Sequence, residues 1–242
     1  MKMYFYLLLA IASLNGQVTS QSKNSPISVL SSIKSVDIKD SNKIITFDPL
    51  WVDSLSLSLP CYEVPVPKRT MRLPNAPRNY RNGTHRGLDF FANWGTPVRS
   101  VAEGVVVRSD LHYEEVPADF RENLLKATTK VGHTPSDIFN SVLLGKSVFL
   151  DHGFDLIPGF RTISIYAHLS HIEKEIVPGA IVKRGELLGK SGNTGMREST
   201  IGSKAGSHLH WEMILQKGEQ EIYLGKGMSN PELYDMLFRI FN

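Results

Sequence analysis

The stretch Ser207-His208-Leu209-His210-Trp211-Glu212 alternates polar and apolar side chains, which is the pattern of a β-strand with one face in a core. Successive side chains of a strand point to opposite faces, so Leu209 and Trp211 are expected to share the buried face. The two histidines then stand on the other face, roughly 6–7 Å apart. Such a pair can face one metal ion, although an isolated H-x-H is more often the polar side of a half-buried strand.

A second cluster of potential ligands lies in Thr84-His85-Arg86-Gly87-Leu88-Asp89-Phe90. In a fully extended chain, His85 and Asp89 would lie about 13 Å apart, too far for both to bind one ion at about 2.1 Å. Gly87 between them permits a bend and a close backbone approach. The H-x-G-x-D spacing therefore indicates a metal site, with an ordinary surface turn as the alternative.

Together, His85, Asp89 and His210 supply three protein ligands, the number that a catalytic Zn²⁺ uses when water takes the fourth position. No thiolate site competes, because Cys61 is the one cysteine in the chain. His168 ends the alternating run 163–168, where it is expected to share a polar face with Ser164. Beside His208, it becomes a candidate general base or transition-state donor.

Four motifs in chain order resemble those of the lysostaphin/LytM-type zinc endopeptidases. They are His85-x-Gly87-x-Asp89, Tyr166-Ala167-His168-Leu169, Gly189-x-Ser191-Gly192-Asn193-Thr194-Gly195 and His208-Leu209-His210-Trp211-Glu212. The resemblance covers about residues 73–214, and four ordered motifs are a far stronger signal than any one of them. It implies one zinc ion held by His85, Asp89 and His210, with His168 and His208 assisting catalysis.

The resemblance also implies a largely antiparallel β-fold with an open groove. The implied substrate is the stem or cross-bridge peptide of peptidoglycan, cleaved at an amide bond. One departure is the long segment from about residue 109 to 146, which carries helix signals and is expected to be a helical insertion that shapes the rim of the groove. A C-terminal helix is predicted over 230–242, with apolar residues on one stripe.

Composition agrees with one main domain; its strand runs make it mainly β, and the resemblance implies an antiparallel sheet or sandwich. The chain has 242 residues, 41% of them hydrophobic and 21% charged. A net charge of +3 is too small for a nucleic-acid-binding footprint. Strand runs are expected within 96–107, 147–150, 161–168 and 180–182, each rich in β-branched residues and bounded by Gly or Pro.

The N-terminus indicates export. Lys2 precedes an apolar run over 4–14 that is too short to span a bilayer, which is typical of a secretory signal peptide over 1–20. Residues 21–80 are expected to be a polar, Pro-punctuated leader with little core of its own, followed by the peptidase domain over 81–242. The expected location is the periplasm, the cell envelope or the outside of the cell, with no membrane span in the mature chain and peptidoglycan peptides as partners.

Two other functions fit parts of the sequence. A non-hydrolytic wall-binding regulator could use the same fold, with a side-chain amide of Asn75, Asn79 or Asn82 in the open zinc position. A lipoyl- or biotinyl-carrier sandwich would need a modified lysine at a hairpin tip, and Lys183 lacks the expected flanking Met or Asp. Of the remaining polar residues, His152 is expected to stabilise a turn.

Overall fold

The structure is a computed structural model that describes residues 45–241. The predicted signal peptide and the first part of the predicted leader lie outside the described residues. Within the described part, none of the helices combines the length and the apolar character needed to cross a membrane.

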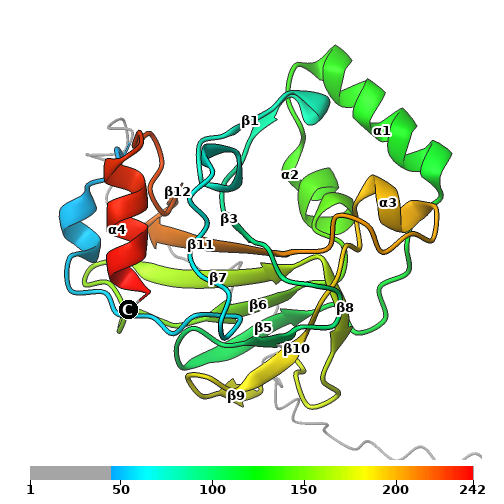
Figure 1. Ribbon diagram of the computed structural model, residues 1–242. Coiled ribbons are helices and arrows are strands. Elements are labelled where there is room, and N and C mark those ends of the chain that lie inside the picture. The colour runs from blue at the N-terminus through cyan, green and yellow to red at the C-terminus, as the bar shows by residue number, and fades with distance from the viewer. Residues whose placement is uncertain (1–44, 242) are drawn as a thin grey trace, which may run out of the picture. The chain divides into compact units, whose positions relative to one another are not determined.

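The centre of the fold is a seven-stranded sheet in which all neighbouring strands are antiparallel (Figure 1). Its strand order is β12-β11-β7-β6-β5-β9, and β3 pairs with β11 outside this path. The strands are β3 (Leu88–Phe90), β5 (Gly104–Ser109), β6 (Val148–Asp151), β7 (Arg161–Ala167), β9 (Ile181–Val182), β11 (Leu209–Lys217) and β12 (Gln220–Tyr223). The predicted mainly antiparallel β-fold is therefore confirmed.

Smaller elements surround this sheet. A three-stranded sheet has the order β4-β10-β8, with β4 (Pro97–Arg99), β8 (Leu169–Ile172) and β10 (Leu187–Ser191), and β1 (Pro77–Arg78) pairs with β2 (Gly83–Thr84). The α-helices are α1 (Ala118–Val131), α2 (Ser136–Ile138), α3 (Arg197–Thr200) and α4 (Glu232–Ile240). The 3-10 turns are η2 (Pro49–Val52), η3 (Thr70–Arg72) and η4 (Asn79–Arg81), and η5 (Phe139–Leu143) is a π-helical turn.

Both faces of the main sheet are covered, which corrects one expectation for β7. Ser164 and Tyr166 were expected on a polar, solvated face, but both are fully buried. The Tyr166 hydroxyl accepts a hydrogen bond from Val101 N at 2.9 Å, and the Ser164 hydroxyl lies 3.3 Å from it. Ile165 packs in a second apolar cluster beneath the insertion. The alternation in the sequence located the strand correctly. The hydroxyl groups of Ser164 and Tyr166 suggested a solvent-facing side, but this face also lies in the core.

The helical insertion and the C-terminal helix are present as predicted. In Figure 1, α1 and α2 lie above the sheet, and α4 lies at its left-hand end. The inward side of α1 is formed by Arg121 and Thr128, whereas Phe120 and Val131 are exposed. The apolar spacing in this helix therefore does not mark its buried face.

The described part of the predicted leader has a different role from the one expected. Residues 45–80 contribute apolar side chains to the main core, among them Phe47, Val52, Leu55, Leu57, Cys61, Val66 and Leu73. Closely spaced prolines and serines separate these apolar side chains, which therefore follow neither a helical nor a strand period. The sequence pattern for this reason did not identify them as core residues. This segment is part of the packed fold, not a separate linker.

Candidate metal centre

The pairing of β3 with β11 places two potential ligands opposite each other. In the antiparallel register, Asp89 faces His210. His85 precedes β3, and Gly87 lies at the bend between them. A Cβ on Gly87 would lie 2.3 Å from the carbonyl oxygen of Trp211, so only glycine allows the bend to approach β11 this closely. The bend that the H-x-G-x-D spacing predicted is therefore present, and it packs directly against β11, the strand that carries His210.

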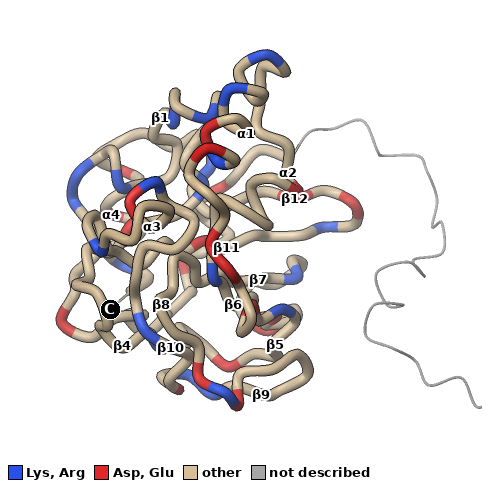
Figure 2. The backbone as a smooth tube through the Cα atoms, turned by 90° about the vertical axis from the view of Figure 1, so that its right-hand side faces the viewer, with Lys and Arg blue, Asp and Glu red and all other residues tan. Residues whose placement is uncertain are grey.

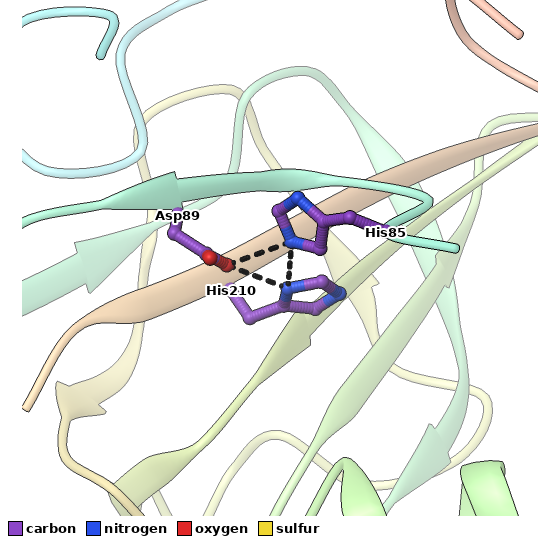
Figure 3. Close-up of side chains that lie close together, drawn as sticks. All are labelled: His85, Asp89 and His210. Carbon is purple, nitrogen blue, oxygen red and sulfur yellow. Dashed lines mark hydrogen bonds and ion pairs between the residues drawn. The ribbon is translucent and has the colours of Figure 1, made fainter. Parts of the chain in front are cut away.

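Three donor atoms converge at this point (Figure 3). His85 Nε2 lies 2.9 Å from Asp89 Oδ1 and 3.1 Å from His210 Nδ1. His210 Nδ1 lies 2.8 Å from the same Asp89 oxygen. His85 is 2% exposed and His210 is 5% exposed, so the cluster is buried on the protein side. These three residues form the one group in the described part of the chain that could hold a metal ion.

Acceptors behind the two imidazoles fix their tautomers. His85 Nδ1–H donates to the carbonyl oxygen of Leu73 at 2.8 Å. His210 Nε2–H donates to Glu212 Oε1 at 2.8 Å. Each ring nitrogen that faces the centre is then available as an electron-pair donor.

The charges of the cluster follow from burial and from these contacts. Burial lowers the pKa of His85. Burial also opposes the charge of His210, but hydrogen bonds with Asp89 and Glu212 outweigh it and raise the pKa of His210 to about 9. Burial acts against the Asp89 carboxylate too, yet the neighbouring histidines hold its pKa well below the usual range. The raised pKa leaves a proton on His210 at neutral pH, and a metal ion bound beside the ionised Asp89 carboxylate would replace that proton on Nδ1.

A second pair of histidines borders the first. The His168 and His208 rings lie 4.9 Å apart, and the His168 and His210 rings lie 5.6 Å apart. His208 Nε2 is 3.5 Å from Asp89 Oδ1. The structure therefore brings all five predicted site residues together.

His168 occupies a special backbone position between β7 and β8. Its φ is +60°, a left-handed conformation that non-glycine residues rarely adopt. Its Nδ1–H donates to the carbonyl oxygen of Thr194 at 2.8 Å, which leaves Nε2 as an acceptor. Burial, followed by the nearby His208 and His210, holds the pKa of His168 well below its usual value. The ring is therefore neutral at pH 7.

The glycine-rich motif 189–195 supports both of these histidines. Thr194 provides the acceptor for His168, and the carbonyl oxygen of Gly192 accepts the backbone N–H of His208 at 3.0 Å. The Asn193 side chain donates to the carbonyl oxygens of Ser203 and Ala205 at 2.8 and 2.9 Å, which holds the loop that leads to β11. The motif thus positions the second histidine pair.

The five site residues line one groove. The insertion supplies part of its wall through Arg121, Phe139 and Leu143. The expected role of the insertion at the rim therefore agrees with its position. Arg78 and Arg81, from the segment just before His85, also line the groove, and Arg81 packs over the Phe139 ring of the insertion.

Arg78 was missed by the sequence analysis. Its guanidinium donates to Asp89 Oδ2 at 2.9 Å and to the carbonyl oxygen of Met71 at 3.0 Å. Asp89 therefore presents one oxygen to the histidines and the other to Arg78. The arginines at 78, 81 and 86 around the H-x-G-x-D motif were the available signal, but a run of basic residues usually indicates a solvated surface.

The asparagines expected near the open position lie elsewhere. The Asn75 side chain donates to the carbonyl oxygens of Gly225 and Met228 at 2.8 and 2.9 Å. Asn79 and Asn82 are exposed, and neither lines the groove. His152 is likewise remote from the metal cluster, since its ring contacts the backbone of Glu103 and the Ser164 hydroxyl.

Comparison with known proteins supports the peptidase family that the four sequence motifs resemble. The model of peptidase family M23 matches residues 127–222, which include His168, His208 and His210. This part of the chain is similar to peptidase family M23. The predicted resemblance to the lysostaphin/LytM-type peptidases is thereby confirmed. His85 and Asp89 precede the matched segment, and the fold brings them to it.

Similar proteins include an uncharacterised metalloprotease of Buchnera aphidicola, 26% identical over 141 residues, or 58% of this chain. The chain spans only 26% of the length of that relative. Among solved structures, the catalytic domain of lysostaphin from Staphylococcus simulans is 20% identical, with 70% of this chain and 87% of that chain covered and a TM-score of 0.36. A zinc-containing peptidase from Vibrio cholerae is also 20% identical, with 69% and 39% covered and a TM-score of 0.37.

Proposed function

We propose that this chain is an exported zinc metalloendopeptidase that hydrolyses amide bonds in the stem or cross-bridge peptides of peptidoglycan. The observation that carries the proposal is the convergence of His85, Asp89 and His210, with two further histidines beside them in one groove. The family M23 match supports the peptidase class. The N-terminal signal predicted from the sequence supports export.

The donor set fits zinc. Two imidazole nitrogens and one carboxylate oxygen lie within 4.8 Å of one another, and the other nitrogen of each ring is held by an acceptor behind it. Donors about 2.1 Å from a tetrahedral zinc lie roughly 3.4 Å apart, close to the 2.8–3.1 Å separations here. A zinc ion held there would act as a Lewis acid toward the scissile carbonyl and would lower the pKa of water.

The second histidine pair suits the proton transfers of amide hydrolysis. His168 is buried and neutral, and its Nε2 is an acceptor, so we assign it the role of general base. His208 lies beside His168, with Nδ1 2.8 Å from the Gly206 carbonyl oxygen and Nε2 3.5 Å from Asp89 Oδ1. We assign it the role of hydrogen-bond donor to the oxyanion that develops during attack.

The regulator alternative is less favoured by the structure. All three candidate ligands converge, and none of the three leader asparagines reaches them. Arg78 contacts Asp89 instead, on the oxygen that faces away from the histidine donors. A groove that keeps its ligand atoms accessible is suited to turnover.

The test compares wild-type protein with His210→Ala, and uses the exposed His112→Ala as the matched control. We expect about one zinc per chain in the wild type and in His112→Ala, with release of peptide fragments from purified peptidoglycan. His210→Ala should lose both zinc and hydrolysis. Zinc content is measured by elemental analysis and fragments by muropeptide chromatography. Retention of zinc with no turnover of any wall preparation contradicts the enzymatic proposal.

A further inference from the structure

Two arginines are buried in the groove beside the histidines. Arg81 ends η4 and is 6% exposed, and Arg121 lies in the first half of α1 and is 8% exposed. Both line the groove that contains the metal cluster, and η4 contacts α1. Figure 2 shows further Lys and Arg positions along the backbone near β1.

These two guanidinium groups make no direct ion pair within the described residues, although the Glu212 carboxylate acts on Arg81 from a longer distance and opposes the lowering of its pKa. Arg81 donates to the carbonyl oxygen of Thr84 at 2.6 Å and packs over the Phe139 ring at 4.6 Å. Arg121 donates through Nε to the carbonyl oxygen of Gly195 at 3.0 Å. Within residues 45–241, no carboxylate oxygen lies within 4.0 Å of either group.

The other two arginines of this region are paired. Arg78 lies 2.9 Å from Asp89 Oδ2, and Arg86 lies 3.0 Å from Glu212 Oε2. The local carboxylates are thus already engaged by other groups. The same holds for Glu115, whose oxygens accept hydrogen bonds from the Gly195 backbone and the Tyr113 hydroxyl.

Burying a guanidinium without a counter-ion is unfavourable unless a ligand supplies the negative charge. Burial lowers the pKa of Arg81, which shows that its surroundings disfavour the charge. A planar guanidinium presents paired N–H donors that match a carboxylate or a phosphate. Among these anions, a peptide substrate carries carboxylates.

We propose that Arg81 and Arg121 form a subsite that binds a free carboxylate of the peptide substrate beside the scissile bond. The inference rests on the proposed function and narrows it, because stem peptides carry ionised carboxylates whereas a bridge made only of glycine carries none along its chain. The carboxylate comes either from the C-terminus of a stem or from an acidic residue within it. Both sources offer the same two oxygens to the arginines.

The experiment uses the wild-type protein and a synthetic cross-linked stem peptide made in four forms. One form has all carboxylates free, one has the C-terminus amidated, one has the acidic residue amidated, and one has both amidated. We expect amidation of the recognised carboxylate to raise KM about tenfold, the loss of one charge-assisted hydrogen-bond pair. The form that raises KM identifies the source of the carboxylate.

The variants are Arg121→Gln, Arg121→Lys and Arg81→Gln, with the exposed Lys130→Gln on the same helix as the control for lost charge. Arg121→Gln should raise KM for the free-carboxylate peptide about tenfold and leave KM for the fully amidated peptide unchanged. Arg121→Lys should restore part of the preference, and Lys130→Gln should retain all of it. Thermal unfolding confirms that each variant is folded.

Equal KM values for the four peptides, or an equal change for all of them in Arg121→Gln, overturn the subsite while leaving the peptidase proposal intact. If the wild-type protein cleaves none of the peptides, the proposed function fails instead. In that case, calorimetric measurement of the affinities of the free and amidated peptides for the wild-type protein tests the subsite independently of cleavage. Equal affinity for the two peptides rejects it.

Discussion

Residues behind the metal cluster decide what its histidines can do. His210 would be an ambiguous ligand on its own, because either ring nitrogen can carry the proton. Glu212 is fully buried and accepts Nε2–H, so Nδ1 is directed to the centre. Arg86 lies 3.0 Å from the second Glu212 oxygen and balances its charge. Glu212 and His210 lie two residues apart on one strand face, a spacing visible in the sequence, whereas Arg86 comes from a distant segment and could not be identified from it.

Replacing the carboxylate at 212 should weaken metal binding without removing a ligand. In Glu212→Gln the acceptor for His210 Nε2–H loses its charge, so the imidazole becomes a poorer donor. We expect zinc affinity to fall about 10- to 100-fold, the effect usual for such supporting groups. Competition with a chromogenic chelator measures this affinity.

The matched control is Glu221→Gln, the same substitution at an exposed position on β12. Glu221→Gln should bind zinc as the wild type does. Unchanged zinc affinity in Glu212→Gln would show that the hydrogen bond to His210 has no role in holding the metal.

His152 gives a pH dependence of stability that is separate from the metal cluster. Burial lowers its pKa from 6.5, and Nδ1–H donates to the Glu103 carbonyl oxygen at 2.6 Å. The unfolded chain therefore binds a proton at a higher pH than the folded protein does. The stability contribution is complete above pH 6.5 and is lost as the pH falls below that value toward the folded pKa.

We expect the urea midpoint of the zinc-loaded wild type to fall from pH 7.5 to pH 5, and to fall less in His152→Gln. Glutamine cannot become charged but retains a donor and an acceptor for Glu103 and Ser164. His133→Gln, at an exposed position, should behave as the wild type does. Parallel pH profiles for the wild type and His152→Gln would rule out the buried histidine as the source.

Among the elements, the strands were the easiest to predict and α1 the hardest. Alternation and the H-x-H pattern located β7 and β11, because a period of two survives in any antiparallel sheet. In α1 the apolar stripe is exposed at Phe120 and Val131, while Arg121 faces inward. Because polar residues form the buried side of this helix, hydrophobic periodicity alone could not identify that side.

The C-terminal helix α4 offers a test of an element that was predicted correctly. Leu237 is fully buried in the main core, whereas its neighbour Phe238 is 50% exposed. Leu237→Ala should lower the free energy of unfolding by about 2–5 kcal/mol, from lost burial and the cavity left behind. Phe238→Ala should cost less than about 1 kcal/mol. Urea unfolding measures both, and similar costs for the two variants would contradict the docking of this helix.

For the whole molecule, the motifs predicted which residues meet but not what holds them in place. The match of four ordered motifs was enough to expect the five histidine and aspartate positions in one site. The contribution of residues 45–80 was missed because their apolar residues are separated by Ser and Pro. Leu73 from this segment accepts the His85 Nδ1–H bond, so the packing of this segment and the orientation of a proposed zinc ligand are coupled.

Cys61 tests this coupling, because it is the one cysteine in the chain and lies within the segment. It is fully buried, and burial raises the pKa of its thiol to about 12, so both access and ionisation oppose its reaction. If residues 45–80 are part of the cooperative fold, labelling by a disulfide reagent across a urea series should follow global unfolding measured by tryptophan fluorescence. Labelling at urea concentrations well below the global midpoint would show instead that the segment detaches on its own. In that case zinc affinity should fall over the same range, because His85 would lose the Leu73 carbonyl that fixes its tautomer.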